Sequence, residues 1–184
     1  MNRVASTLLL AVSLTTLAGC ASRDASLAKG VDDPCTTVQG LIAEYPEGFP
    51  SYRGKANNTR NITTYRAKED LVAGHCEIWR WGNGDTAYSC SAAAPSIDIA
   101  RDRYLKSVNY LMQCLGPDWS TDEMTRDRDG ETDGQLTRFT SDQHPELSVS
   151  AHLIDEKRGP KRSYTNYLYL GTSSQDPGAS PGSR

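Results

Sequence analysis

The sequence predicts an α+β fold in which one antiparallel sheet carries helices on one face, giving a two-layer sandwich. Two segments repeat apolar residues at the three-and-four spacing of a helix, and several others show the alternation of a strand. Polar turns separate the strand-like segments, so neighbouring strands should pair antiparallel. The expected order is helix, three strands, helix, then two or three strands, stapled by disulfides.

The first helix is expected to begin at Asp33 and to end before Pro46. Aspartate is a favoured N-cap residue, and Pro34 at the first helical position gives up no hydrogen bond, because that N–H has no partner inside a helix. A second proline cannot continue the helix, so Pro46 stops it. The buried face of this helix would consist of Cys35, Val38, Leu41, Ile42 and Tyr45.

Three strands are expected to follow a polar, Asn-rich loop at 55–61. They cover residues 61–68, 75–81 and 85–90, which are rich in β-branched and aromatic side chains. The last two flank Gly82-Asn83-Gly84. Asn-Gly between two such segments is a strong signal for a tight hairpin, because both residues tolerate a positive φ.

A second helix is expected from Pro95 to Leu115, and Gly116-Pro117 ends it in the usual order. The second half of the chain then returns to strands, which are separated by polar turns. These strands cover residues 136–141, 146–154 and 163–171. The buried face of the helix would consist of Ile97, Ala100, Tyr104, Val108, Leu111 and Leu115.

The first twenty residues have the layout of a secretory signal. Arg3 precedes an apolar run over 4–17, which is shorter than the ~20 residues of a membrane-spanning helix and is interrupted by Ser and Thr. The run ends in Leu17-Ala18-Gly19-Cys20, which resembles the lipobox of bacterial lipoproteins. This resemblance covers only the first twenty residues and implies lipidation of Cys20. The alternative is an ordinary signal peptide, which would leave a soluble secreted protein.

The resemblance also sets the expected domain boundaries and location. Residues 1–19 would be the lipoprotein signal peptide, and 20–32 a lipidated flexible tether that links the protein to the membrane. In that family an aspartate after the cysteine usually retains the protein at the inner membrane. Ala21 stands there, which implies the outer membrane, facing the periplasm. A single α+β domain would span 33–171, and the Gly-, Ser- and Pro-rich segment 172–184 would be disordered.

The four remaining cysteines are expected to form two disulfides, because an even number in an extracytoplasmic domain favours bridges. Their nearest spacing is 14 residues, unlike the close pairs of zinc or thioredoxin-like sites. Cys76 shares its parity with Ile78, on the face that the helices should cover. We therefore expect Cys35–Cys76 and Cys90–Cys114. The alternative pairs Cys76 with Cys90 across the hairpin and Cys35 with Cys114 between the helices.

The net charge argues against nucleic-acid binding, and the lack of known catalytic motifs argues against enzymatic activity. Loss of residues 1–19 removes one of the 20 basic residues and none of the 23 acidic ones, leaving a net charge of −4. A nucleic-acid-binding protein needs a basic face, so no nucleic-acid partner is expected. The sequence contains no P-loop, G-x-G-x-x-G, G-x-S-x-G or H-E-x-x-H motif. We therefore expect no cofactor, no catalytic residues and no enzymatic activity.

One acidic segment deserves a test for calcium. With Asp129 as the first position of an EF-hand loop, Glu131 and Asp133 take the third and fifth positions. Position twelve is then Thr140, where a bidentate glutamate is required, so a solvated hairpin turn is the better prediction. In an alternative hypothesis Asp127, Asp129 and Glu131 would serve a small envelope hydrolase.

Two aromatic pairs form a possible binding surface. Trp79 and Trp81 share one face of a predicted strand, and Tyr167 and Tyr169 share one face of another. An exposed row would bind a protein or a glycan, whereas a buried row would only pack the core or strengthen strand pairs. We therefore expect a lipid-anchored binding or accessory module for another envelope protein. A hydrolase and a purely structural lipoprotein remain the alternatives.

Overall fold

In the computed structural model, which describes residues 30–128, 130–157 and 161–178, the protein is built on one antiparallel sheet of eight strands. The strand order is β1-β2-β3-β4-β8-β7-β6-β5. The helices are α2 (Pro34–Glu44) and α3 (Ile97–Leu115). The strands are β1 (Arg53–Asn58), β2 (Ile62–Ala67), β3 (His75–Trp81), β4 (Thr86–Ala94), β5 (Ser120–Arg128), β6 (Glu131–Thr140), β7 (Leu147–Glu156) and β8 (Ser163–Thr172).

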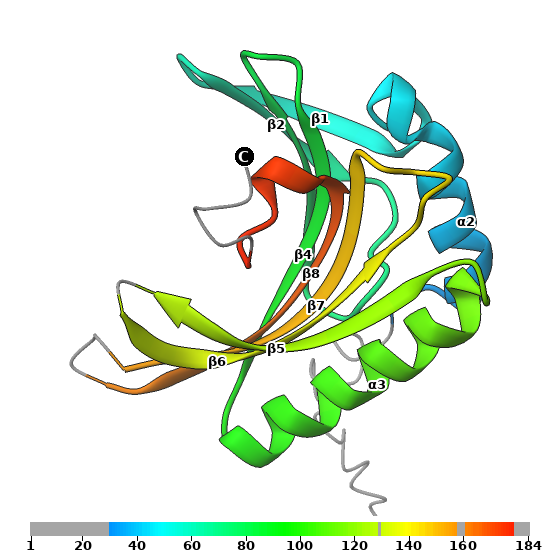
Figure 1. The fold of residues 1–184 in the computed structure, drawn as a ribbon. Coiled ribbons are helices and arrows are strands. Elements are labelled where there is room, and N and C mark those ends of the chain that lie inside the picture. Colours follow the sequence, from blue (N-terminus) through cyan, green and yellow to red (C-terminus); the bar gives the residue numbers. More distant parts are fainter. Residues whose placement is uncertain (1–29, 129, 158–160, 179–184) are drawn as a thin grey trace, which may run out of the picture.

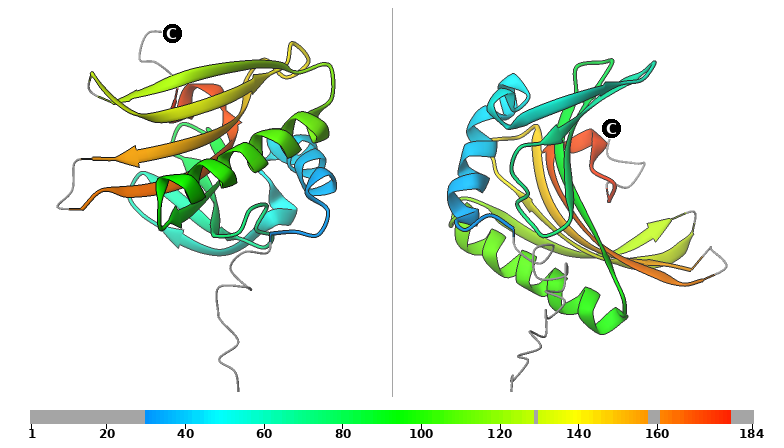
Figure 2. Two further views of the ribbon diagram at one scale, coloured as in Figure 1. Left: turned by 90° about the horizontal axis from the view of Figure 1, so that it is seen from below. Right: turned by 180° about the vertical axis from the view of Figure 1, so that it is seen from behind.

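The sheet is strongly curved, and its two faces have different coverings (Figures 1 and 2). Both helices pack on the convex face, and the segment that follows β8 lies on the concave face. The hairpins β1–β2 and β5–β6 form the two edges of the sheet. The predicted α+β class and the antiparallel sheet are therefore confirmed.

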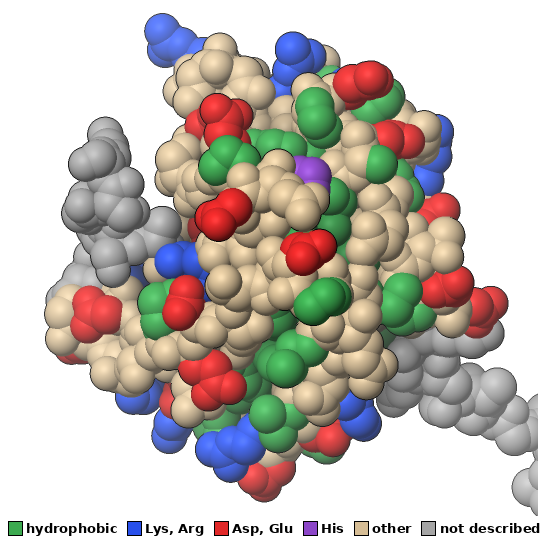
Figure 3. All heavy atoms as spheres, turned by 45° about the vertical axis from the view of Figure 1, so that its right-hand side comes forward, with side chains coloured by type: hydrophobic (Ala, Val, Ile, Leu, Met, Phe, Trp, Pro, Cys, Tyr) green, Lys and Arg blue, Asp and Glu red, His purple; other side chains and the backbone are tan. Residues whose placement is uncertain are grey.

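The core lies between the helices and the convex face. Alternate residues of the central strands point toward the helices, as the period-two pattern requires. The helix-covered surface mixes acidic and apolar side chains (Figure 3). The core side chains include Val38, Leu41, Ile78, Tyr88, Leu111, Phe139, Val149, Leu168 and Leu170, each at most 1% exposed.

The first helix begins at the cap that the sequence indicates, and the second begins at a serine cap that was not expected. The Asp33 carboxylate accepts a hydrogen bond from the Thr36 N–H at 3.1 Å, and Pro34 occupies the first turn. Ser96 caps α3 through the Ile99 N–H at 3.4 Å, so that helix begins at Ile97, two residues later than expected. It ends before Gly116, which has a φ of 81°.

The predicted numbers of strands were too low, because both edge strands escaped the sequence analysis. β1 occupies part of the segment that we expected to be a loop, and every one of its last five residues is exposed. β5 is rich in charged residues and has only Arg126 buried. Each of these strands is held by backbone hydrogen bonds to one neighbouring strand. Because their side chains face solvent, they show no alternation of apolar and polar residues. Charged side chains are typical of sheet edges that are protected against pairing with another chain.

The preferred disulfide pairing was wrong, and the alternative pairing is the one that the structure contains. Cys76 lies directly opposite Cys90 in the β3–β4 hairpin, with their Cα atoms 4.0 Å apart. The second bridge joins Cys35, in the first turn of α2, to Cys114, in the last turn of α3. The reason lies in the hairpin: a turn centred on Asn83 places residues 76 and 90 at equal distances along the two strands.

The folded part extends past Gly171, where we had placed its end. Thr172 closes β8, Ser173–Gln175 form a short 3₁₀ turn, and Asp176 is only 3% exposed. A composition without large apolar residues misled the prediction, because a buried ion pair holds this segment. The predicted signal peptide, Cys20 and the segments 20–29 and 179–184 lie outside the described residues. Within the described part, no helix is both long and apolar enough to cross a membrane.

Candidate functional site: a cleft on the concave face

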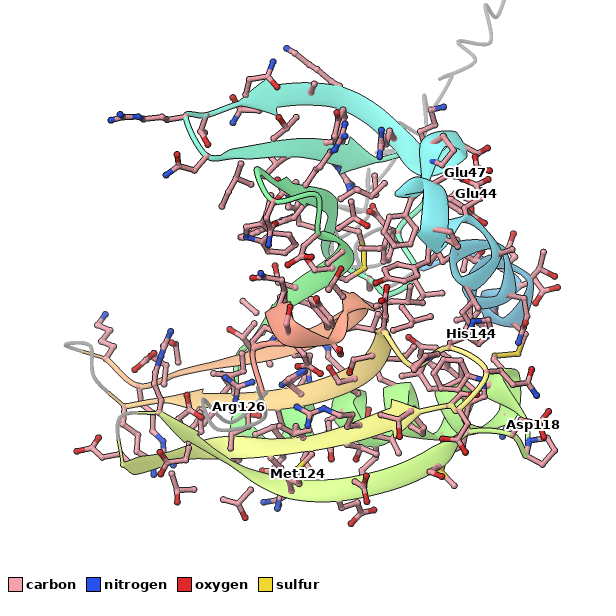
Figure 4. All side chains as sticks on the ribbon, turned by 45° about the horizontal axis from the view of Figure 1, so that its top comes forward. Glu44, Glu47, Asp118, Met124, Arg126 and His144 are labelled. Atoms are coloured by element: carbon pink, nitrogen blue, oxygen red, sulfur yellow. A yellow bond between two sulfur atoms is a disulfide. The ribbon has the colours of Figure 1, made fainter. Side chains whose placement is uncertain are left out.

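A cleft of about 240 Å³ opens on the concave face of the sheet, on the side away from the helices. Its lining combines aromatic side chains from β3 and β8, small residues of β4, arginines of β5, and residues that follow β8. Figure 4 labels Arg126 in this group. The lining residues are Trp79, Trp81, Ala87, Ser89, Arg126, Arg128, Ile154, Tyr167, Tyr169, Gln175 and Pro177.

Strand parity and register explain why the cleft forms here. Trp79 and Trp81 alternate with Cys76 and Ile78, which point into the core, so both tryptophans must face the concave side. The row that starts at Trp79 continues through Ala87 to Gly171 on the neighbouring strands. A Cβ on Gly171 would lie 2.4 Å from the Cβ of Ala87, so no larger residue fits. Small residues between large aromatic ones leave the depression.

The four aromatic residues singled out in the sequence meet at this cleft, but they differ in exposure. The rings of Trp79 and Trp81 lie 5.9 Å apart and are half-buried. Tyr167 is also half-buried, whereas Tyr169 is 1% exposed and its hydroxyl donates to the Thr172 carbonyl at 2.6 Å. Three of the rings can therefore contact a ligand, and Tyr169 supports the wall behind them.

Below the cleft lies a buried polar network that the sequence analysis missed. The Arg126 guanidinium bonds the Asp133 carboxylate through Nε at 3.2 Å. The same guanidinium donates through Nη1 to His152 Nδ1 at 2.5 Å, and His152 Nε2 lies 2.7 Å from Ser150 Oγ. These residues come from β5, β6 and β7, so only the strand register brings them together.

His152 is neutral in this network. A guanidinium carries only donors, so His152 Nδ1 must accept and the ring proton must sit on Nε2, where it is donated to Ser150. Burial lowers the pKa of His152 far below its ordinary range, and the nearby Arg126 and Arg138 lower it further, while Asp176 opposes them. The ring of Tyr167 packs edge-on against His152 at 5.5 Å, which connects the network to the cleft wall.

Residues 173–178, which we call the strap, cross the concave face and close one end of the cleft. The Asp176 carboxylate accepts hydrogen bonds from Ser148 Oγ at 2.7 Å, Gly178 N–H at 2.9 Å and Arg138 Nε at 3.1 Å. Burial raises the pKa of Asp176, but the charges and hydrogen bonds around it together lower it. Asp176 is therefore an ionised anchor that holds Gln175 and Pro177 at the cleft.

The acids proposed for catalysis or calcium lie elsewhere. Asp127 accepts a hydrogen bond from the Gly130 N–H at 2.9 Å in the β5–β6 turn, and Glu131 begins the next strand on the surface. Asp133 is buried against Arg126, and Asp129 lies outside the described residues. None of the three described residues, Asp127, Glu131 and Asp133, lines the cleft. Among the described residues, no three His, Cys, Asp or Glu side chains gather closely enough to hold a metal ion.

The other two histidines have local partners and do not line the cleft. His75 bonds Glu77 at 2.9 Å on the surface, and His144 stacks on Trp119 with ring centroids 5.8 Å apart (Figure 4). The cleft therefore offers flat apolar surface and hydrogen-bond donors, with no carboxylate among its lining residues. Such a lining suits binding of an apolar group next to an acceptor.

Comparison with protein-family models, with curated proteins and with solved structures finds no match for this chain.

Proposed function

We propose that the chain is a lipid-anchored periplasmic lipoprotein of the outer membrane that serves as a non-enzymatic binding module for another envelope protein. The observation that carries this proposal is the meeting of Trp79, Trp81 and Tyr167 at one cleft. Half-buried aromatic side chains around a small pocket are typical of the centre of a protein–protein interface. A volume of about 240 Å³ matches one or two protruding side chains of a partner.

The lining also suggests the chemistry of the partner. Arg128, whose side chain is 56% exposed, provides donors beside the aromatic rings. Gln175 uses one of its two Nε2 hydrogens to donate to Asp85 at 2.7 Å, and the other remains as a further donor. Arg128 forms an ion pair with Glu156 at 3.2 Å, which offsets its positive charge, so the rim of the cleft is only mildly cationic. We expect the partner to insert an aromatic or aliphatic side chain and to place a carbonyl or carboxylate against these donors.

The position of Gly30 and Val31, on the face of the sheet opposite the cleft, supports attachment to a membrane through the preceding residues. Gly30 and Val31 lie on the helix side, where the Val31 N–H donates to the Asp70 carbonyl at 3.1 Å. Gly30 lies ten positions after Cys20, so a tether could reach at most about 36 Å from the lipid. Because the cleft opens on the opposite face of the sheet, the anchor would leave it free to face a partner.

Site-specific photo-cross-linking in cells tests the proposal. A photoreactive amino acid at Trp81 should cross-link to one envelope protein, because this side chain lies at the cleft. The matched control carries the probe at Leu105, which is 50% exposed on the helix-covered face. Equal products from both positions, or none from Trp81 in a folded protein, would contradict a binding role for the cleft.

The anchor is tested separately by intact mass. Wild-type protein should carry a diacylglyceryl modification and lack residues 1–19, whereas Cys20→Ala should carry no lipid. An unprocessed chain in the wild type would remove the anchoring part of the proposal and leave the cleft to be judged by its own cross-links.

A further inference from the structure

A second, larger cavity lies on the other face of the sheet. It has a volume of about 460 Å³, within the range of ~300–1,000 Å³ that is usual for ligand pockets. The connection between β2 and β3 forms one wall through Leu71, Val72 and Ala73, and one side of α3 forms the other. Its floor includes Ala92 of β4 and Ala151 of β7.

The cavity exists because small residues lie where two helices diverge. α2 and α3 are joined by the Cys35–Cys114 bridge at one end, and α3 packs on the central strands through Ala100, Tyr104 and Leu111. Alanine side chains are short, so this part of the floor fills little of the space beneath the helix. A second stripe of α3, which includes Ile99, Arg103 and Tyr110, therefore faces an open space.

Two buried polar atoms at the cavity have no hydrogen-bond partner among the described residues: Asn166 Oδ1 and the Tyr110 hydroxyl. Asn166 is 7% exposed and uses its Nδ2 to donate to the Ala100 carbonyl at 2.7 Å, which leaves its acceptor unused. Burial raises the pKa of Tyr110; the nearby Ser107 hydroxyl opposes this without forming a bond of normal geometry. Both atoms are buried in this structure. Because such atoms are costly to bury without a partner, a side-chain rotation that turned either atom toward the cavity would let a ligand hydrogen-bond to it.

The mouth of the cavity carries a positive charge. Lys106 is paired with Asp102 at 2.7 Å, so these two charges cancel. Arg103 Nη1 donates to the Ala93 carbonyl at 2.9 Å, a neutral partner. One basic charge therefore remains in excess among the three charged residues of α3 that line the cavity.

We propose that this cavity binds a hydroxylated fatty acid, that is, a single acyl chain with a hydroxyl group and a carboxylate end. The apolar walls take the chain, and the carboxylate lies at Arg103. A hydroxyl group can accept from Tyr110 or donate to Asn166 Oδ1, which a saturated chain cannot do. The cavity shares Tyr167 with the lining of the concave cleft, but its proposed ligand contacts, Arg103, Tyr110 and Asn166, are not part of that lining. The proposal does not depend on lipidation of Cys20.

Calorimetric titration of the full chain with Cys20→Ser, which removes any attached lipid, tests the site. We expect hydroxydodecanoate to bind at one site per chain and about threefold to tenfold more tightly than dodecanoate, as one added hydrogen bond allows. Equal affinities, no saturable binding, or binding only as micelles would overturn the proposal. Failure of anchoring in the wild type would not change these results.

Paired variants locate the site. Ala92→Leu fills the floor of the cavity and should abolish binding, whereas Ala93→Leu, one residue along β4 and facing the concave side, should leave it unchanged. Equal affinities in the two folded variants would place the ligand elsewhere and overturn the assignment.

The Tyr110→Phe variant distinguishes a tyrosine hydroxyl that bonds the ligand from one that bonds a trapped water molecule. It should weaken hydroxydodecanoate binding about threefold or more, leave dodecanoate unchanged, and not lower the melting temperature of the unliganded chain. If water satisfied the hydroxyl, the melting temperature would fall and the two affinities would keep their ratio, which would contradict the proposal.

Discussion

At the scale of single residues, the concave face buries charges that balance one another. Arg126 and Arg138 are opposed by Asp133 and Asp176, and the imidazole between them is held neutral by its hydrogen bonds. Buried ion pairs contribute little net stability against apolar replacements, but removal of one partner is costly. The network therefore fixes the strands and the strap in one arrangement more than it adds to stability.

The neutral His152 makes stability depend on pH. The folded state lowers its pKa from the ordinary 6.5 to about 3, chiefly through burial. Between these values the unfolded chain binds a proton that the folded chain does not, so stability falls as the pH is lowered. We expect the unfolding free energy of the wild type to fall by about 1.4 kcal/mol more per pH unit than that of His152→Gln.

Urea unfolding between pH 4 and pH 7, at several points, measures the two slopes. His75→Gln is the matched control, since it removes an exposed imidazole that is not part of the buried network. Parallel curves for the wild type and His152→Gln would show that the imidazole is charged in the folded protein.

At the scale of the elements, the two disulfides constrain loops of very different length. Cys35–Cys114 spans 79 residues and Cys76–Cys90 spans 14. Loop-closure entropy then predicts losses of about 4.5 and about 3 kcal/mol when each pair is replaced by alanine. In urea unfolding, the double variant that lacks Cys35–Cys114 should lose more unfolding free energy than the one that lacks Cys76–Cys90. The reverse order would show that the hairpin disulfide stabilises the folded state itself, beyond its effect on the unfolded chain.

The elements also show what the sequence could predict. Apolar periodicity, Asp33 and Gly116 placed both helices within two residues, and Asn83-Gly84 placed the central hairpin. The edge strands have no such pattern because their side chains face solvent. The same turn could have given the correct Cys76–Cys90 pairing, since a hairpin register follows from its turn.

The candidate site was predictable only in part. Strand parity placed Trp79 and Trp81 on one face of a strand, and Tyr167 and Tyr169 on one face of another. The two pairs meet at one cleft only because β4 lies between β3 and β8 in the sheet. Arg126 and His152 carry no signal in the sequence, because residues far apart in the chain form their contacts. Asp176 was hidden in a segment whose composition is typical of disorder.

At the scale of the whole molecule, Asp176 ties the strap to the concave face of the sheet. Asp176→Ala should free residues 173–178 by leaving Arg138 without its carboxylate, and should lower the unfolding free energy by about 3–5 kcal/mol. Hydrogen exchange of the strap amides should accelerate at least about tenfold, as expected for local opening. Asp142→Ala, at an exposed turn, is the matched control.

Unchanged exchange in Asp176→Ala would mean that the backbone alone holds the strap. Faster exchange throughout the sheet would mean that the substitution unfolds the domain rather than releasing one segment.

The placement of β8 between β4 and β7 has a consequence for biogenesis. β4 pairs with β8 across residues 87–171, so the two halves of the sheet stay separate until the last strand is available. Such non-local pairing slows folding, because a long loop must close before its contacts form. A nascent polypeptide without its final strand should thus remain protease-sensitive.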